Sequence, residues 1–211
     1  MKPYACYLFD ADGTLIDTVD LIYRCFVHGL GVHSQRTVTR AEVESLVGLT
    51  LRAQYERYLG PLSDQQYAVI RDTHMGYQMR IHRDHVKAFP GVAAELSRLH
   101  AAGRRLGVVS SRLRETLTLY LGETGLAPYF QTVVTPEDTQ RHKPDPQPVL
   151  LALQRLQVLP GDALMVGDAA WDVECAAAAG VDSALVSWSR SDPSLMTVKP
   201  TYCIAGLGEL L

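Results

Sequence analysis

Acidic, hydroxyl and basic side chains occur in this sequence at the ends of short apolar runs, or in the loops near them. Short continuous apolar runs indicate buried strands. In an open parallel sheet, ligands bind beyond the carboxyl ends of the strands, so polar residues at these positions are expected to converge on one site. The residues concerned are Asp10 and Asp12, Ser110 and Ser111, Lys143, and Asp168 with Asp172.

The acidic members of this set indicate a metal-assisted reaction of a phosphate. Carboxylates of Asp10, Asp168 and Asp172 in one crevice would repel one another, and a hard divalent cation with oxygen ligands removes that repulsion. Mg²⁺ is the usual cation beside phosphate. A carboxylate in this setting can act as a nucleophile. A second carboxyl two residues later, such as Asp12, could protonate the leaving oxygen and then activate water.

The remaining polar residues would hold the phosphate. Lys143 offers a fixed positive charge, Ser110 offers a hydroxyl, and Gly13 allows the backbone to approach a ligand closely. Each also has a simpler interpretation when taken alone. Lys143 would be a solvated loop lysine, and Ser110 would form an ST-turn or cap a helix. Asp168 and Asp172 would cap the helix that follows them.

The apolar runs and the segments between them predict an α/β fold. Strands are predicted at residues 4–9, 106–109, 131–134, 163–166 and 183–186, and helices at 91–102, 113–123, 146–157 and 170–179. Strands that alternate with helices form a parallel, doubly wound sheet with right-handed crossovers. The continuous apolar character of the strands indicates a sheet covered on both faces. Gly103 and Gly180 stand where helix C-termini are expected.

One region interrupts this alternation. Between Asp17 and about His85 no strand is predicted, whereas residues 18–30 and 50–59 have helical patterns. Apolar and aromatic residues at 67, 70, 74, 77 and 81 also recur at the spacing of one helix face. We therefore expect a core domain formed by residues 1–16 and 86–211, with a helical domain of residues 17–85 inserted after the first strand.

Composition and charge exclude several classes of protein. The 211 residues are 47% hydrophobic and 20% charged, and the net charge of −3 argues against nucleic-acid binding. No apolar run reaches the length of a membrane span, and no signal peptide is evident, so we expect a cytoplasmic protein without membrane contact. The seven histidines show no zinc-binding spacing, and the four cysteines form no metal-binding pattern. Cys6 and Cys175 are predicted to be buried thiols.

Four sequence motifs together resemble those of the haloacid dehalogenase superfamily. Asp10-Ala11-Asp12-Gly13-Thr14 resembles the first motif of its phosphatase branch, and Ser110 after an apolar strand resembles the second. Lys143-Pro144 resembles the third motif, and the run from Gly167 to Asp172 resembles the fourth, a GDxxxD pattern. The motifs follow the family order. The helical insert is similar to the small α-helical (C1) cap of the phosphoglycolate phosphatase-like group.

The resemblance implies a Rossmann-like core, Mg²⁺ dependence and a role for each residue. Asp10 would attack phosphorus and bind Mg²⁺. Asp12 would be the general acid and base, with its backbone carbonyl on the metal. Asp168 would bind the metal directly, and Asp172 directly or through water. The transferring phosphoryl group would be held by Ser110, Ser111 and Lys143.

The sequence departs from the family pattern at two places. The second motif often has Asn and then Lys after its hydroxyl residue, but here Ser111 and Arg112 follow, which leaves the substrate uncertain. Ser187-Trp188-Ser189 stands where relatives often have Trp-Gly, which indicates a local change of turn. In the insert, Arg52 or Arg80 could bind a substrate carboxylate, although a solvated helix arginine is the simpler interpretation of each.

The function predicted from these features is hydrolysis of a small phosphomonoester, with phosphoglycolate as a candidate, through an aspartyl-phosphate intermediate. A phosphomutase similar to β-phosphoglucomutase, an inorganic pyrophosphatase and a catalytically silent binding protein remain as alternatives. A dehalogenase is disfavoured because it needs neither Mg²⁺ nor a second acid. The expected partner is a small phosphorylated metabolite, and the protein is expected to be a monomer or a homodimer.

Overall fold

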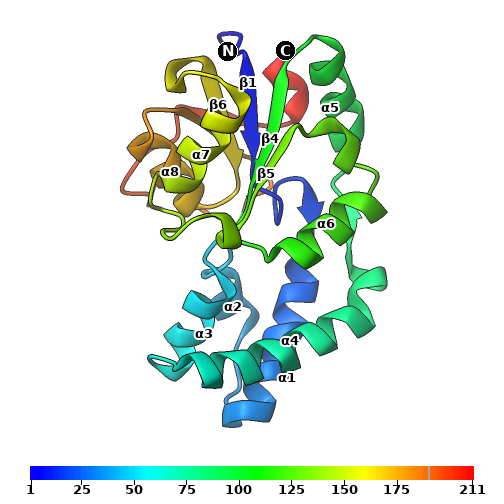
Figure 1. The fold of residues 1–211 in the computed structure, drawn as a ribbon, viewed down its shortest axis with the longest axis vertical. Coiled ribbons are helices and arrows are strands. Elements are labelled where there is room, and N and C mark those ends of the chain that lie inside the picture. Colours follow the sequence, from blue (N-terminus) through cyan, green and yellow to red (C-terminus); the bar gives the residue numbers. More distant parts are fainter. Residues whose placement is uncertain (190) are drawn as a thin grey trace.

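A six-stranded parallel sheet forms the centre of the structure, a computed structural model that describes residues 1–189 and 191–211. The strand order is β5-β4-β1-β6-β7-β8, so the first strand lies in the middle. Figure 1 shows this sheet at the end of the molecule that carries both termini. The strands are β1 (Cys6–Phe9), β4 (Arg105–Val109), β5 (Thr132–Val134), β6 (Ala163–Gly167), β7 (Asp182–Val186) and β8 (Tyr202–Ile204).

Helices cover both faces of the sheet, and alternate residues of β1 contribute to two separate apolar clusters. Tyr7 and Phe9 belong to the cluster beneath α5 (Val92–Ala101) and α6 (Arg114–Glu123). Cys6 and Leu8 belong to the cluster beneath α7 (Gln147–Leu156) and α8 (Ala170–Ala178). Because both faces of the sheet are covered, its strands must be apolar at successive positions. The predicted α/β fold is confirmed.

Four helices form the insert between β1 and β4, and they lie beyond one end of the sheet (Figure 1). They are α1 (Val19–Ser34), α2 (Arg40–Glu44), α3 (Leu51–Leu59) and α4 (Asp64–His85). The insert has an apolar cluster of its own, in which Phe26 packs against Tyr55 with ring centroids 4.7 Å apart. Side chains before the helices fix where they begin: Thr50 accepts a hydrogen bond from the backbone of α3, and Ser63 forms a capping box with Gln66 of α4.

Three short features were not predicted from the sequence. Strand β2 (Ile16–Asp17) pairs antiparallel with β3 (Lys87–Ala88), so the prediction that no strand lies between Asp17 and His85 is wrong at Asp17, where β2 ends. Two-residue strands are too short to show a periodicity, and the same is true of the five-residue helix α2. Strand β8 lies at the edge of the sheet and has only three residues, one of them exposed.

The described residues also bear on the membrane and cysteine predictions. Within residues 1–189 and 191–211, no helix has the length and apolar character needed to cross a bilayer. Cys6 and Cys175 are free and buried, as predicted, and burial raises the pKa of each thiol to about 12. Neither thiol therefore ionises to a nucleophilic thiolate near neutral pH.

A buried histidine of the insert predicts a pH-dependent stability. Nδ1 of His74 lies 2.9 Å from the hydroxyl of Tyr55, and burial lowers the pKa of His74 to about 3. Between pH 6.5 and pH 3 the unfolded chain takes up a proton there that the folded chain does not, so stability falls as pH falls. We expect this residue to lower the free energy of unfolding by about 1 kcal/mol between pH 7.5 and pH 5.5.

Urea denaturation of wild type and His74→Gln at both pH values measures this contribution. The variant should lose that part of the pH dependence while other titrating groups act equally in both proteins. An identical pH dependence in the two proteins would contradict the assignment.

Candidate active site

Asp10, Lys143 and Asp172 form a buried ion cluster at the carboxyl end of β1. Nζ of Lys143 donates to Oδ1 of Asp10 at 2.7 Å and to Oδ1 of Asp172 at 2.6 Å. All three side chains are at most 4% exposed. The other oxygen of Asp172 accepts from the backbone amide of Ala169 at 3.1 Å. Both Asp172 oxygens are thus engaged, whereas Oδ2 of Asp10 has no such contact with Lys143.

The loop after Asp10 lies close to Asp168, which follows β6. Gly13 has a φ of +80°, and a Cβ atom there would lie 2.3 Å from Oδ2 of Asp168. Any other residue would collide with this carboxylate as well as strain the backbone. The indole Nε1 of Trp188 donates to the carbonyl of Gly13 at 3.0 Å and so supports the same loop.

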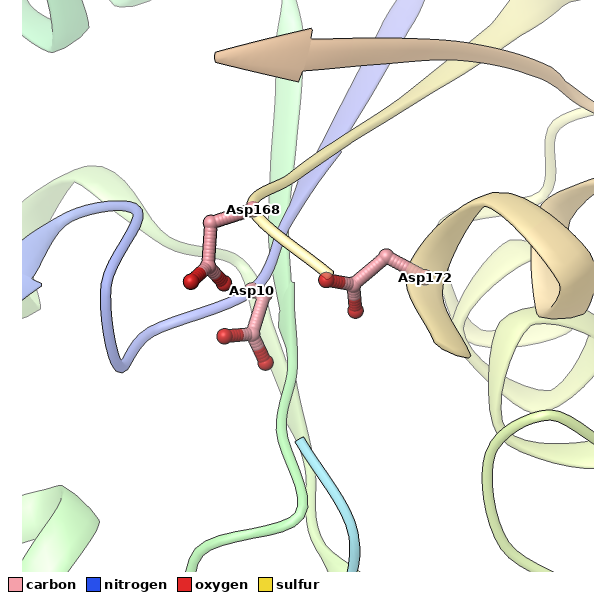
Figure 2. Close-up of side chains that lie close together, drawn as sticks. All are labelled: Asp10, Asp168 and Asp172. Carbon is pink, nitrogen blue, oxygen red and sulfur yellow. The ribbon is translucent and has the colours of Figure 1, made fainter. Parts of the chain in front are cut away.

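The carboxylates of Asp10, Asp168 and Asp172 converge on one space, with ligand oxygens within 4.8 Å of one another. Figure 2 shows them approaching from three elements: the end of β1, the segment after β6 and the first turn of α8. Oxygen donors at this spacing suit a hard divalent cation. Because both oxygens of Asp172 are engaged, Asp10 and Asp168 would be direct ligands, and Asp172 would act through water, the second of its two predicted roles; these metal roles stay predictions.

The electrostatics of the cluster favour a bound cation. Burial raises the pKa of Asp10 to about 7 against the opposing effect of Lys143. Burial, together with the charges of Asp10 and Asp172, raises the pKa of Asp168 well above its ordinary value. The two carboxylates that it contacts raise the pKa of Lys143, although burial alone would lower it. One lysine therefore does not compensate three carboxylates, of which Asp10 and Asp172 are buried and Asp168 is half-buried, and a divalent cation would.

Asp12 lies apart from that cluster and contacts a different cation. Its carboxylate accepts three hydrogen bonds from Arg112, at 2.8 to 3.0 Å, and one from the hydroxyl of Thr18 at 2.5 Å. Thr18 precedes α1, but its side chain makes no capping hydrogen bond to that helix. Asp12 and Asp10 nevertheless line the same cavity.

The two serines of the second motif differ in what their hydroxyls contact. Oγ of Ser110 accepts from the backbone amide of Arg112 at 3.1 Å, the ST-turn considered above, and Ser110 also lines the cavity. Oγ of Ser111 donates to the carbonyl of Gly48 in the insert at 2.5 Å. Phosphate binding by Ser110 and Ser111 stays a prediction. The structure gives Ser111 a second role, as a contact between the sheet and the insert.

A cavity of about 50 Å³ lies between these residues and the insert. A single water occupies roughly 10–15 Å³ on this measure, so the cavity admits a group of only a few heavy atoms. The insert contributes uncharged side chains to its wall, including Gln54, His74 and Gln78. Neither Arg52 nor Arg80 is part of the wall. Arg52 instead contacts Glu56, Asp64 and the carbonyl of Leu62.

Three of these residues were not assigned a role from the sequence. Arg112 was noted only as a departure from the motif, and Trp188 only as a change of turn. Gln54 has a buried Oε1 without a hydrogen-bond partner among the described residues, while its Nε2 donates to the carbonyl of Leu49. A buried polar side chain on a helix of the insert, such as Gln54, is a signal for a residue of the active site. That signal can be recognised only when the packing of the insert against the sheet is known.

Known proteins resemble this chain in sequence and in fold. Residues 7–186 match the family described as Haloacid dehalogenase-like hydrolase. Pyrophosphatase PpaX of Bacillus velezensis is 35% identical over 211 residues, which cover 100% of this chain and 96% of that protein. Pyrophosphatase PpaX of Bacillus pumilus is 34% identical, with 97% and 93% covered.

A solved structure of a haloacid dehalogenase-like protein from Bacteroides fragilis superposes with a TM-score of 0.90 at 29% identity, covering 99% of this chain and 100% of that one. This chain belongs to the haloacid dehalogenase-like hydrolase family. The family, the fold and the enzyme class predicted from the four motifs are thereby confirmed.

The carboxylate cluster predicts how Mg²⁺ binding responds to substitution. Asp168→Asn should weaken Mg²⁺ binding by about 100-fold, because it removes one charged oxygen ligand and leaves the rest of the cluster in place. Isothermal titration of the metal-free protein with Mg²⁺ measures the change, and the exposed Asp162→Asn is the matched control. Unaltered Mg²⁺ affinity in Asp168→Asn would place the metal elsewhere.

Proposed function

We propose that this hydrolase is a Mg²⁺-dependent phosphatase that cleaves a small phosphate substrate through a phosphorylated Asp10. The observation that supports this proposal is the position of Asp10. Its carboxylate is buried beside Lys143, groups with Asp168 and Asp172, and lines a cavity shared with Asp12 and Ser110. A nucleophile, a compensating charge and a candidate proton donor are thus brought to one small space.

In this proposal one carboxylate oxygen of Asp10 attacks phosphorus, and the other would be its metal ligand. The bond from phosphorus to the leaving oxygen breaks, and Asp12 supplies the proton that the leaving group takes up. Asp12 then accepts a proton from water, which attacks the phosphoryl group and releases inorganic phosphate and Asp10. Asp10, Asp168 and the backbone carbonyl of Asp12 would hold Mg²⁺, with Asp172 acting through water, and the ion would supply positive charge to the phosphoryl group.

The insert, in the same proposal, acts as a cap on the core. Residues 17–85 pack around an apolar cluster of their own and complete the cavity wall opposite Asp10. The leaving group of the substrate would lie against this wall. A cavity of about 50 Å³ at this wall favours a small leaving group.

Inorganic pyrophosphate is a second candidate substrate, and the sequence comparison favours it. The relatives that align over nearly their whole length are named pyrophosphatases. The leaving group of pyrophosphate is a phosphate ion, which is small enough for this cavity.

A substrate panel tests these proposals. Pyrophosphate, phosphoglycolate, β-glucose 1-phosphate and p-nitrophenyl phosphate are each incubated with the protein and Mg²⁺, and released phosphate and isomerised sugar phosphate are both measured. A kcat/KM for pyrophosphate at least 10-fold above that for any monoester supports the second candidate. Isomerisation without phosphate release indicates a mutase, and no turnover together with no Mg²⁺ binding contradicts the enzyme proposal.

A further inference from the structure

Arg112 is a buried arginine whose guanidinium group is directed at Asp12. Nε lies 3.0 and 2.8 Å from the two carboxylate oxygens, and Nη2 lies 2.8 Å from Oδ1. The side chains are 7% and 14% exposed. Both residues line the cavity that Asp10 also lines. The ion pair is therefore part of the wall that a bound substrate would touch.

The guanidinium is itself held by α6, which in turn contacts the insert. It lies over the ring of Tyr120 in α6, 4.8 Å from the ring centroid, and Nη1 is 3.4 Å from the hydroxyl of Thr116. The Tyr120 hydroxyl accepts a hydrogen bond from Gln78 in α4 at 2.9 Å, and His82 stacks on the ring with centroids 5.7 Å apart. A continuous set of contacts thus runs from the insert through Tyr120 to Arg112.

We infer that Arg112 is a positioning residue that fixes the Asp12 carboxylate at the wall of the cavity. The inference rests on the proposed function, in which Asp12 moves protons. A planar guanidinium binds a carboxylate in a forked geometry and so sets its orientation, whereas a lysine at this position would act as a point charge. The hydroxyl of Thr18 holds Oδ1 as well, so the carboxylate is fixed from two sides.

A positioning role makes a prediction that a merely structural role does not. If Arg112 acts through Asp12, its loss matters only while Asp12 is present. A double-mutant cycle of Asp12→Ala, Arg112→Met and the combined variant isolates this dependence. The substrate is phenyl phosphate with Mg²⁺, because its poor leaving group requires the proton that Asp12 supplies, and long incubations keep the Asp12→Ala variants measurable.

The expected result is strongly non-additive. Arg112→Met should lower kcat on the order of 100-fold when Asp12 is present, as a misplaced catalytic group does. In the Asp12→Ala background the same substitution should lower kcat by less than about 3-fold. Arg112→Lys should restore part of the lost kcat, and KM should change little in either background. Arg98→Met, which removes an exposed arginine of α5, is the control.

Other outcomes overturn the inference. Equal losses of kcat in both backgrounds would show that Arg112 supports the fold or contacts the substrate directly. An unchanged kcat in Arg112→Met would show that the ion pair between Arg112 and Asp12 does not contribute to catalysis. Should Arg112→Met fail to fold, Arg112→Lys replaces it in the cycle, with and without Asp12→Ala, and the same comparison decides. Full activity in Asp12→Ala would instead refute the role of Asp12 in the proposed function, which separates the two failures.

Discussion

Asp10→Asn is expected to lower kcat for phosphate release by at least about 10⁴-fold, because an amide is a far weaker nucleophile than a carboxylate. The substitution preserves the size of the side chain, and its amide oxygen can still accept a hydrogen bond from Lys143, which lies 2.7 Å from Oδ1 of Asp10. KM for a substrate held mainly by other groups should therefore change much less than kcat. Steady-state phosphate release with Mg²⁺ measures both parameters.

Two further measurements make this result specific to the nucleophile. Asp17→Asn alters an exposed carboxylate at the end of β2 and should keep the wild-type kcat. Rapid acid quenching of the wild type with ³²P-labelled substrate should leave label on the protein, and Asp10→Asn should retain none. Full phosphate release by Asp10→Asn would contradict the proposed function.

Lys143→Met is expected to destabilise the metal-free protein by about 3–5 kcal/mol, because removing one partner leaves buried charges uncompensated. Nζ of Lys143 contacts Asp10 and Asp172, and Asp168 lies within the same group of carboxylates. Mg²⁺ binds the folded state only, so adding it should recover part of the loss. Activity should also fall, by more than about 100-fold, because the phosphoryl group loses a fixed positive charge.

Urea denaturation with EDTA and then with Mg²⁺ measures the two effects separately. Lys87→Met removes an exposed lysine in β3 and should change neither stability nor activity. The predicted signature is a larger stabilisation by Mg²⁺ in Lys143→Met than in wild type. Equal stability of the metal-free variant and the metal-free wild type would refute the role assigned to this ion cluster.

The amino-acid sequence was sufficient for five of the six strands, for their parallel arrangement and for the proximity of several candidate site residues. Strands buried on both faces must be apolar throughout, so β1, β4 and β6 were recognisable as short apolar runs. Polar residues that follow such strands meet at one edge of a parallel sheet. The proximity of Asp10, Asp168 and Lys143 could therefore be predicted across more than 130 residues of chain.

The features that were not predicted are short or depend on contacts between distant segments. Strands β2 and β3 have two residues each and pair only because the ends of the insert come together. The bond from Ser111 to the carbonyl of Gly48 depends on how the insert sits on the sheet. The same holds for the indole of Trp188 beneath Gly13. Periodicity indicates which face of an element is buried, but not which partner it meets.

Residue types and spacing were enough to indicate phosphoryl-transfer chemistry, because that chemistry requires particular groups at the ends of particular strands. The role of Asp10 as its nucleophile follows from the family resemblance and stays a prediction. Only the folded chain showed that Asp12 is bound by Arg112, a residue 100 positions away, and that Arg52 turns from the cavity toward Glu56 and Asp64. These choices depend on the distances between charged groups after folding. A carboxylate pairs with the cation that the packing of the helices brings within hydrogen-bonding distance. Local sequence patterns do not predict that packing.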